Sequence, residues 1–145
     1  MTPLIWTALL VASAAPAEPP AVVTTRAAAF DHLSARRLTS ELKAAGLKVE
    51  RKGAVRQPFF AVPAQVLAIG ADEVEVFVFA SAPDAERAAA TVSADGGTVG
   101  TSAMHWMAPP HFHRRGRTIL IHLGNGADVR SALERIAGAP FSGRP

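Results

Sequence analysis

Apolar residues recur at helical spacing in three parts of this chain, and they predict three helices. Residues 31–45 carry one apolar stripe, and Gly46 is well placed to end that helix. Residues 81–84 have the form of a helix cap with proline in the first turn, so a second helix is expected as far as about residue 92. Residues 125–137 predict the third, from a capping Asn-Gly-Ala-Asp start to a stop at Gly138.

Alternation of apolar and polar residues predicts strands between these helices. We expect strands at residues 47–50, 65–69, 73–79, 104–107, 111–114 and 117–123. The second and third of them form a hairpin, and the last two form another around Arg115 and Gly116. Lys52 and Gly53 are expected to turn the chain, and the prolines within residues 55–63 favour an irregular segment.

The order of these elements predicts an α+β fold, because hairpins and helices do not alternate as in a doubly wound fold. We expect a two-layer sandwich, with a mainly antiparallel sheet of about four to six strands and about three helices on one face. Residues 30–145 form this single domain. Residues 18–29, rich in Pro, Ala and Thr, are expected to form a flexible lead-in.

The first 17 residues contain no charged side chain and predict a secretory signal peptide. Their apolar run is shorter than the roughly 20 residues that a membrane span needs, and Pro16 interrupts it. Small residues allow cleavage after Ala14 or after Ala17. We therefore expect an exported protein, periplasmic or extracellular, with no transmembrane segment once the leader is removed.

Composition excludes several classes of function. The chain has no cysteine, which rules out disulfides, thiol catalysis and thiolate metal sites. Its 15 Lys and Arg residues are scattered among 12 Asp and Glu residues, so a nucleic-acid-binding surface is not expected. No G-x-S-x-G elbow occurs, and Asp72, Glu73 and Glu75 have the pattern of turn and exposed-strand charges. The sequence therefore predicts no enzyme.

One glycine-rich turn stands between a predicted strand and a helix, as phosphate-binding turns do. It reads Gly124-Asn125-Gly126, but Val129 replaces the third glycine of the dinucleotide-binding pattern. The motif therefore favours a simple turn that also starts the helix.

Three histidines are predicted to share one side of the second hairpin. Because side chains alternate along a strand, His111, His113, Leu120 and His122 point to the same side, with His111 diagonal to His122. The opposite side carries Phe112 and is expected to face the core. The histidine side is then the solvent face of a one-sided sheet.

Two interpretations of the histidine side remain open. Neutral imidazoles bind Zn²⁺, Cu²⁺ or Ni²⁺, and His105 on a preceding strand could add a fourth nitrogen to those of His111, His113 and His122. Alternatively, these residues form an exposed surface that needs no cofactor. Neither strand offers an Asp or Glu to orient a ligating ring, which favours the second interpretation.

The arginines at the hairpin tip and nearby apolar residues form a candidate binding surface. Guanidinium groups here could contact phosphate, anionic lipid headgroups or an acidic partner. The candidate set comprises Arg114, Arg115, Arg117, Leu120, Trp106, Phe59 and Phe60. A solvated turn and a set of core aromatics are the alternative interpretations.

Two segments give the chain a distinctive pattern, Gln57-Pro58-Phe59-Phe60 and the run Trp106-Met107-Ala108-Pro109-Pro110-His111-Phe112. Over about residues 38–143 the chain resembles a group of small exported bacterial proteins of uncharacterised function. Members of that group often have aromatic residues at the positions of His113 and His122. The resemblance implies a sheet face used for packing or association, and it implies no catalytic residue.

The leading expectation is an exported, non-catalytic binding or interaction module. Its partner would be a protein, an envelope component or a second copy of the chain. A divalent-metal-binding protein that uses the histidine side is the alternative.

Overall fold

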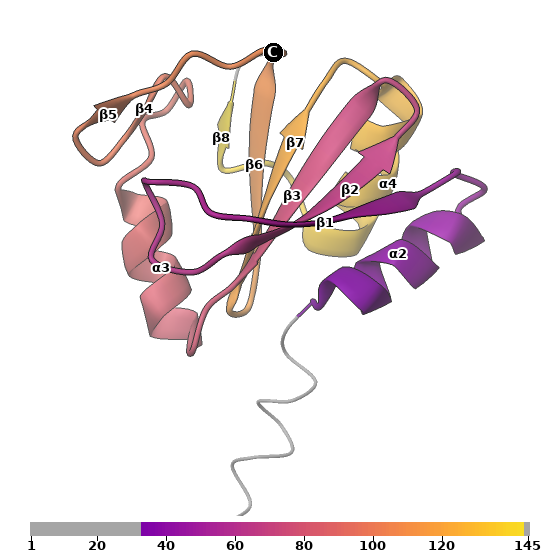
Figure 1. Cartoon of the computed structure of the whole chain (residues 1–145), viewed down its shortest axis with the longest axis horizontal. Coiled ribbons are helices and arrows are strands. Elements are labelled where there is room, and N and C mark those ends of the chain that lie inside the picture. Colours follow the sequence, from indigo (N-terminus) through magenta and orange to yellow (C-terminus); the bar gives the residue numbers. More distant parts are fainter. Residues whose placement is uncertain (1–32, 144–145) are drawn as a thin grey trace, which may run out of the picture.

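The computed structural model describes residues 33–143, in which three helices flank a six-stranded antiparallel sheet (Figure 1). The predicted signal peptide and the whole lead-in, residues 18–29, lie outside the described residues. In chain order the elements are α2 (Ala35–Ala44), β1 (Glu50–Val55), β2 (Ala64–Ile69), β3 (Asp72–Val78), α3 (Ala82–Ala90), β4 (Thr98–Val99), β5 (Ser102–Ala103), β6 (Pro110–Arg115), β7 (Thr118–Leu123), α4 (Ala127–Ala137) and β8 (Ser142–Gly143). The sheet has the order β1-β2-β3-β7-β6-β8, and β4 pairs with β5 in a separate small hairpin.

The sheet is covered on both faces. Helices α2 and α4 pack on one face, and α3 packs on the other beside the β4–β5 hairpin (Figure 1). The predicted α+β sandwich of helices and antiparallel strands is thus confirmed, but the helices are divided between two faces instead of sharing one. Central strands require this, since β3 has Val76 buried on one side and Phe77 on the other.

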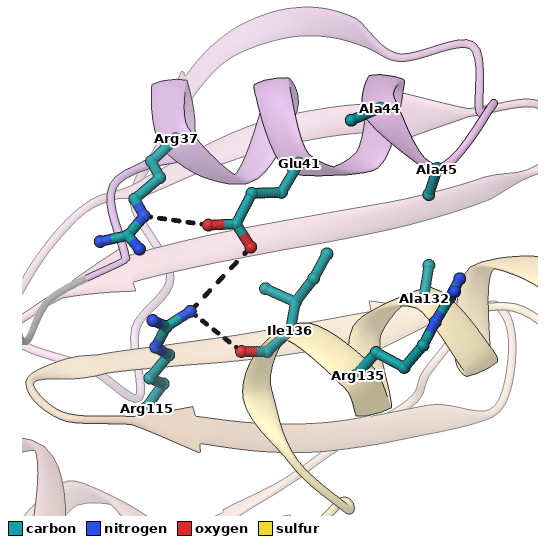
Figure 2. A pocket seen from close by; sticks show the side chains of 8 residues that line it. All are labelled: Arg37, Glu41, Ala44, Ala45, Arg115, Ala132, Arg135 and Ile136. Carbon is teal, nitrogen blue, oxygen red and sulfur yellow. Dashed lines mark hydrogen bonds and ion pairs between the residues drawn. The ribbon is translucent and has the colours of Figure 1, made fainter.

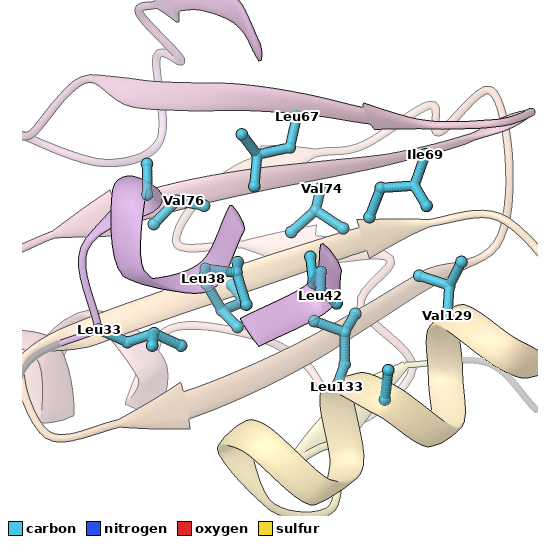
Figure 3. Close-up of a cluster of buried hydrophobic side chains, with 12 residues drawn as sticks. Leu33, Leu38, Leu42, Leu67, Ile69, Val74, Val76, Val129 and Leu133 are labelled. Carbon is cyan, nitrogen blue, oxygen red and sulfur yellow. The ribbon is translucent and has the colours of Figure 1, made fainter. Parts of the chain in front are cut away.

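The core beneath α2 and α4 is aliphatic (Figure 3). Leu38 and Leu42 of α2 and Leu133 of α4 are fully buried there, against the strands that carry Leu67 and Val74. Burial of one such leucine contributes about 2 kcal/mol of transfer free energy. This core therefore fixes both helices on the same face.

The core beneath α3 is mainly aromatic. Phe77 and Phe112 are fully buried, and Phe60 meets Phe77 edge to face, with ring centroids 4.9 Å apart. Helix α3 is rich in alanine and places Ala85 against these rings. Small side chains let the helix lie close to the sheet.

Two predicted strands differ from the structure. The first is β1, which starts at Glu50, and the expected turn at Lys52 and Gly53 is a β-bulge within it. Gly53 has φ 103°, and the extra residue bends an edge strand without reversing it. The second, at residues 104–107, is not a strand, because the Trp106 indole N–H donates to the Gly96 carbonyl at 2.7 Å and folds this segment back.

The second hairpin has a tighter turn than expected. Arg115 pairs with Thr118 across a two-residue loop, so His111 lies directly opposite His122 and not diagonal to it. The shift is two residues, which leaves each side chain on its predicted side. The prediction that the three histidines share one side of the sheet is therefore confirmed.

Candidate functional site

Helices α2 and α4 lie side by side, and a groove of about 580 Å³ opens between them at the hairpin tip (Figure 2). The groove is lined by Arg37, Glu41, Ala44, Ala45, Arg115, Ala132, Arg135 and Ile136. Its wall is thus apolar along both helices and charged at the residues that project from them.

Three guanidinium groups and one carboxylate face this groove. Arg37 and Glu41 form an i,i+4 ion pair on α2, with 2.9 Å between Nε and Oε1. Arg115 donates to the Ile136 carbonyl at 3.0 Å and lies 4.0 Å from the second oxygen of Glu41 (Figure 2). Arg135 donates to the Ser131 carbonyl at 3.4 Å and has no carboxylate within ion-pair distance among residues 33–143. The groove therefore carries an excess of two positive charges.

The local sequence explains this convergence of charge. Arg37 and Glu41 lie one helical turn apart, and Arg135 belongs to the last turn of α4, where a cation interacts favourably with the helix dipole. Arg115 is the last residue of β6 and shares its side of the strand with His113. Each arginine satisfies a local rule, and the packing of α2 against α4 brings them together.

Deeper under α4, the three histidines form a buried row. His111 is 4% exposed, and His113 and His122 are fully buried, so the expectation of a solvent-facing histidine side is wrong. The physical reason is α4, which covers this face because the apolar stripe of its own sequence needs burial. The rings of His111 and His122 stack with centroids 5.3 Å apart.

Asp72, at the start of β3, supplies the acidic partner of this row. Its Oδ2 lies 2.8 Å from Nε2 of His122 and accepts the backbone N–H of Gly126 at 2.9 Å. The turn before α4 wraps this carboxylate, since a Cβ at Gly124 would lie 2.2 Å from Oδ1. The glycine turn therefore surrounds the carboxylate of Asp72, and glycine lets the backbone of the turn approach that group closely.

His113 and His111 have different partners. His113 donates from Nδ1 to the Gly138 carbonyl at 2.8 Å, and its buried Nε2 has no hydrogen-bond partner among the described residues. Nε2 of His111 lies 3.4 Å from a guanidinium nitrogen of Arg130. Burial lowers the pKa of both histidines below the ordinary value of 6.5, and the charge of Arg130 lowers the pKa of His111 further. Both rings are therefore neutral at neutral pH.

The proposed metal ligands are only partly brought together. His111, His113 and His122 are neighbours, whereas His105 is exposed in the loop after β5 and not on a strand. Within residues 33–143, no group of three or more His, Asp or Glu side chains is arranged to hold a metal ion. Asp72 and Gly138 each bind one ring nitrogen, of His122 and His113, and the second nitrogen of each ring has no hydrogen-bond partner among the described residues.

The predicted arginine tip is divided between the two faces of the sheet. Arg115 enters the groove, while Arg114 points to the α3 side and lies 3.4 Å from Glu86. Arg117 contacts the Ala80 carbonyl at 3.5 Å. The three arginines therefore do not form one patch, because neighbours along a strand point to opposite sides.

The other members of the predicted surface are core residues or part of an aromatic cluster. Leu120 is fully buried and Phe60 is 6% exposed, so neither offers a surface. Phe59 and Trp106 are half-buried and meet edge to face at 5.9 Å. These aromatics pack the α3 side of the sheet.

Sequence reasoning missed Arg37, Glu41 and Arg135 of the groove, and it assigned Asp72 to an exposed turn. The i,i+4 spacing of Arg37 and Glu41 was a local signal, but nothing local indicates that α2 lies beside α4. Asp72 is 8% exposed and Glu75 is 3% exposed, so both corrections concern buried carboxylates. Both carboxylates are buried because β3 lies at the centre of the sheet, beside β7.

The described histidines do not form a hydrolase triad. His122 pairs with Asp72 as the base of such a triad would, but its other ring nitrogen is buried and unpartnered. In residues 33–143, no serine or threonine hydroxyl hydrogen-bonds to a histidine ring, and Ser142 donates to the Ser93 carbonyl. The arrangement holds α4 in place and lacks an activated nucleophile.

A scan of protein-family models and searches of curated proteins and of solved structures found no match to this chain. Among the described helices, none combines the length and apolar character needed to cross a membrane.

Proposed function

We propose that this chain is an exported, non-catalytic binding module whose groove between α2 and α4 takes an anionic ligand. One observation carries the proposal, the convergence of three guanidinium groups from α2, β6 and α4 on a groove with a single carboxylate. Carboxylate, sulfate and phosphate groups match the planar donors of arginine. The apolar wall of Ala44, Ala132 and Ile136 favours a ligand that joins an acidic group to an apolar part.

The state of the side chains supports an anion more than a cation. Glu41 is already shared by Arg37 and Arg115, so its charge is neutralised within the protein. Arg135 is exposed and uses Nε for the Ser131 carbonyl. The side chains of Arg37 and Arg115 are exposed by one-third or more. Solvent therefore weakens their attraction for an anion and makes that attraction sensitive to salt.

The probe for this proposal is sulfate, titrated at low ionic strength and followed by NMR or calorimetry. Arg135→Gln removes one guanidinium and should weaken sulfate binding about fivefold, while Glu41→Gln should strengthen it, because the competing carboxylate is gone. Arg87→Gln is the matched control, since Arg87 lies on α3 across the sheet and is paired with Asp84. Equal effects of Arg135→Gln and Arg87→Gln would overturn the assignment of the groove.

A further inference from the structure

Helix α4 is joined to the sheet by polar contacts at both ends, and the histidine row takes part in each. At its start, the Gly126 N–H binds Asp72, which also holds His122, and Arg130 contacts His111. Just after its end, the Gly138 carbonyl accepts from His113. Between these points the helix contacts the sheet through apolar side chains and through Arg115 of β6, which donates to the Ile136 carbonyl at 3.0 Å.

The surroundings of His111 and His113 favour neutral rings, because the Arg130 contact needs an unprotonated Nε2 on His111 and because burial disfavours a charge on His113. The Gly138 oxygen can only accept, so Nδ1 of His113 carries the proton, and the buried Nε2 has no acceptor for a second proton within residues 33–143. A guanidinium can only donate, so Nε2 of His111 acts as the acceptor for Arg130. A proton on that nitrogen would remove the contact and place a second positive charge against Arg130.

The surrounding charges do little to stabilise those extra protons. Asp72 of β3 is engaged by His122 of β7 and by the Gly126 amide. Strand β6 adds the positive charge of Arg115, and α4 adds Arg130 and the exposed Glu134. Glu134 and the Gly138 carbonyl favour the protonated form of His113, but burial outweighs them. Helix α2 faces the groove with the paired Arg37 and Glu41, and β8 contributes no titratable side chain.

We infer that His111 and His113 form an acid-sensitive latch, which holds α4 on the sheet when neutral and loosens it when protonated. The latch would control the groove, because Ala132, Arg135 and Ile136 of α4 form one of its walls. This control of the groove rests on the proposed function, since it means that the anion bound near neutral pH is released as the pH falls.

The direction of the pH effect follows from linkage. The pKa values of His111 and His113 are lowered in the docked state, so the undocked state binds more protons once the pH falls below about 6.5. The docked state is therefore fully favoured above that pH and is progressively lost below it. Each proton changes the docking equilibrium by up to about tenfold per pH unit.

Amide hydrogen exchange of the full chain, measured near pH 7.5 and pH 5.5 and corrected for the intrinsic exchange rate, tests the latch. Peptides that cover α4 should exchange at least about tenfold faster at the lower pH. Peptides that cover α3, on the opposite face, should keep their corrected rate. Unchanged α4 exchange, or equal acceleration of both helices, would overturn the inference.

Variants separate the latch from general acid instability. The double substitution His111→Gln and His113→Gln removes both titrating rings and should abolish the faster α4 exchange. His105→Gln is the control, because His105 is exposed in a loop, and it should preserve the response. If the double variant does not fold, NMR titration of the native imidazoles decides, since pKa values at or above 6.5 for His111 and His113 contradict the latch.

Sulfate binding at the same two pH values distinguishes this inference from the proposed function. Sulfate keeps its charge over this range, so a loss of affinity at the lower pH reports on the groove. Acid-dependent α4 exchange without sulfate binding at either pH supports the latch and contradicts the anion site. Sulfate binding at both pH values with pH-independent α4 exchange contradicts the latch alone.

Discussion

Glu75 and Asp72 are carboxylates on the same strand, and they meet different environments. Asp72 is held by His122 and a backbone amide, whereas Glu75 points to the α3 side. There it accepts a hydrogen bond from Gln57 at 2.7 Å, and its second oxygen is buried without a partner among the described residues. Burial raises the pKa of Glu75, and the hydrogen bond from Gln57 opposes this.

This difference predicts that Glu75→Gln stabilises the protein near pH 7. A raised pKa in the folded state means that the folded protein loses stability as the pH rises through that pKa, since the ionised form is disfavoured. The neutral amide removes this penalty and can still accept from Gln57, so the free energy of unfolding should rise by about 1 kcal/mol. Urea denaturation of both proteins near pH 7 measures it, and lower stability of the variant would contradict the argument.

Residue types and strand alternation were sufficient to place the three histidines on one side of the sheet. They were not sufficient to decide whether that side is exposed. The answer depends on which strand lies next to β7, which is set by contacts such as that of His122 with Asp72, 50 residues apart, and on the helix that covers this side, which contacts β6 over 19 to 25 residues. Asp72 therefore had the pattern of a turn residue until its neighbour in the sheet was known.

At the scale of elements, the three helices begin in different ways. Ser34 caps α2 and Ser81 caps α3 with a side-chain oxygen, at 3.2 Å from the backbone nitrogens of Arg37 and Asp84. Helix α4 has Gly126 at its N-cap and no side-chain cap of its own. Its first amide is satisfied by Asp72, which makes the start of α4 depend on β3.

The turn before α4 should therefore tolerate no side chain at Gly124. Gly124→Ala introduces a Cβ at a positive φ of 145° that collides with Asp72, and the free energy of unfolding should fall by about 3 kcal/mol. Gly100→Ala is the matched control, at φ 59° with open space around it, and should cost only about 1 kcal/mol. Thermal or urea unfolding compares the two, and equal losses would show that the collision is relieved at no cost.

Local signals predicted the elements unevenly. All three helices were expected because their start, stop and apolar signals lie within about a dozen residues, although the start of α4 is bound by Asp72 of β3. The bulge in β1 and the two-residue strands β4 and β5 escaped notice, since such short pairings are fixed by tertiary contacts. The groove could not be predicted from local sequence for the same reason, because it exists only where α2 and α4 meet.

For the whole molecule, the expectation that sequence alone supports is export. If the leader is a signal peptide, the protein purified from its natural host should begin at Ala15 or at Glu18. Intact-mass spectrometry of the native protein reads this directly. Replacement of Leu9 and Leu10 by Arg should leave the leader attached, whereas a native protein that begins at Met1 or Thr2 would contradict the expectation.

The hydrogen bonds between Leu33 and Thr118 join positions 85 residues apart, and β7 lies between β3 and β6 in the sheet. Strand β7 joins the first half of the domain to the second, and it is synthesised after most of the domain. Until it is available, neither helix α2 nor β3 has its final neighbour. The pairing of β3 with β7 joins these halves, and such distant pairings form slowly. This order of assembly suits the export that we propose. A chain whose core is completed only when β7 is available stays unfolded for longer, and an unfolded chain can pass through a membrane.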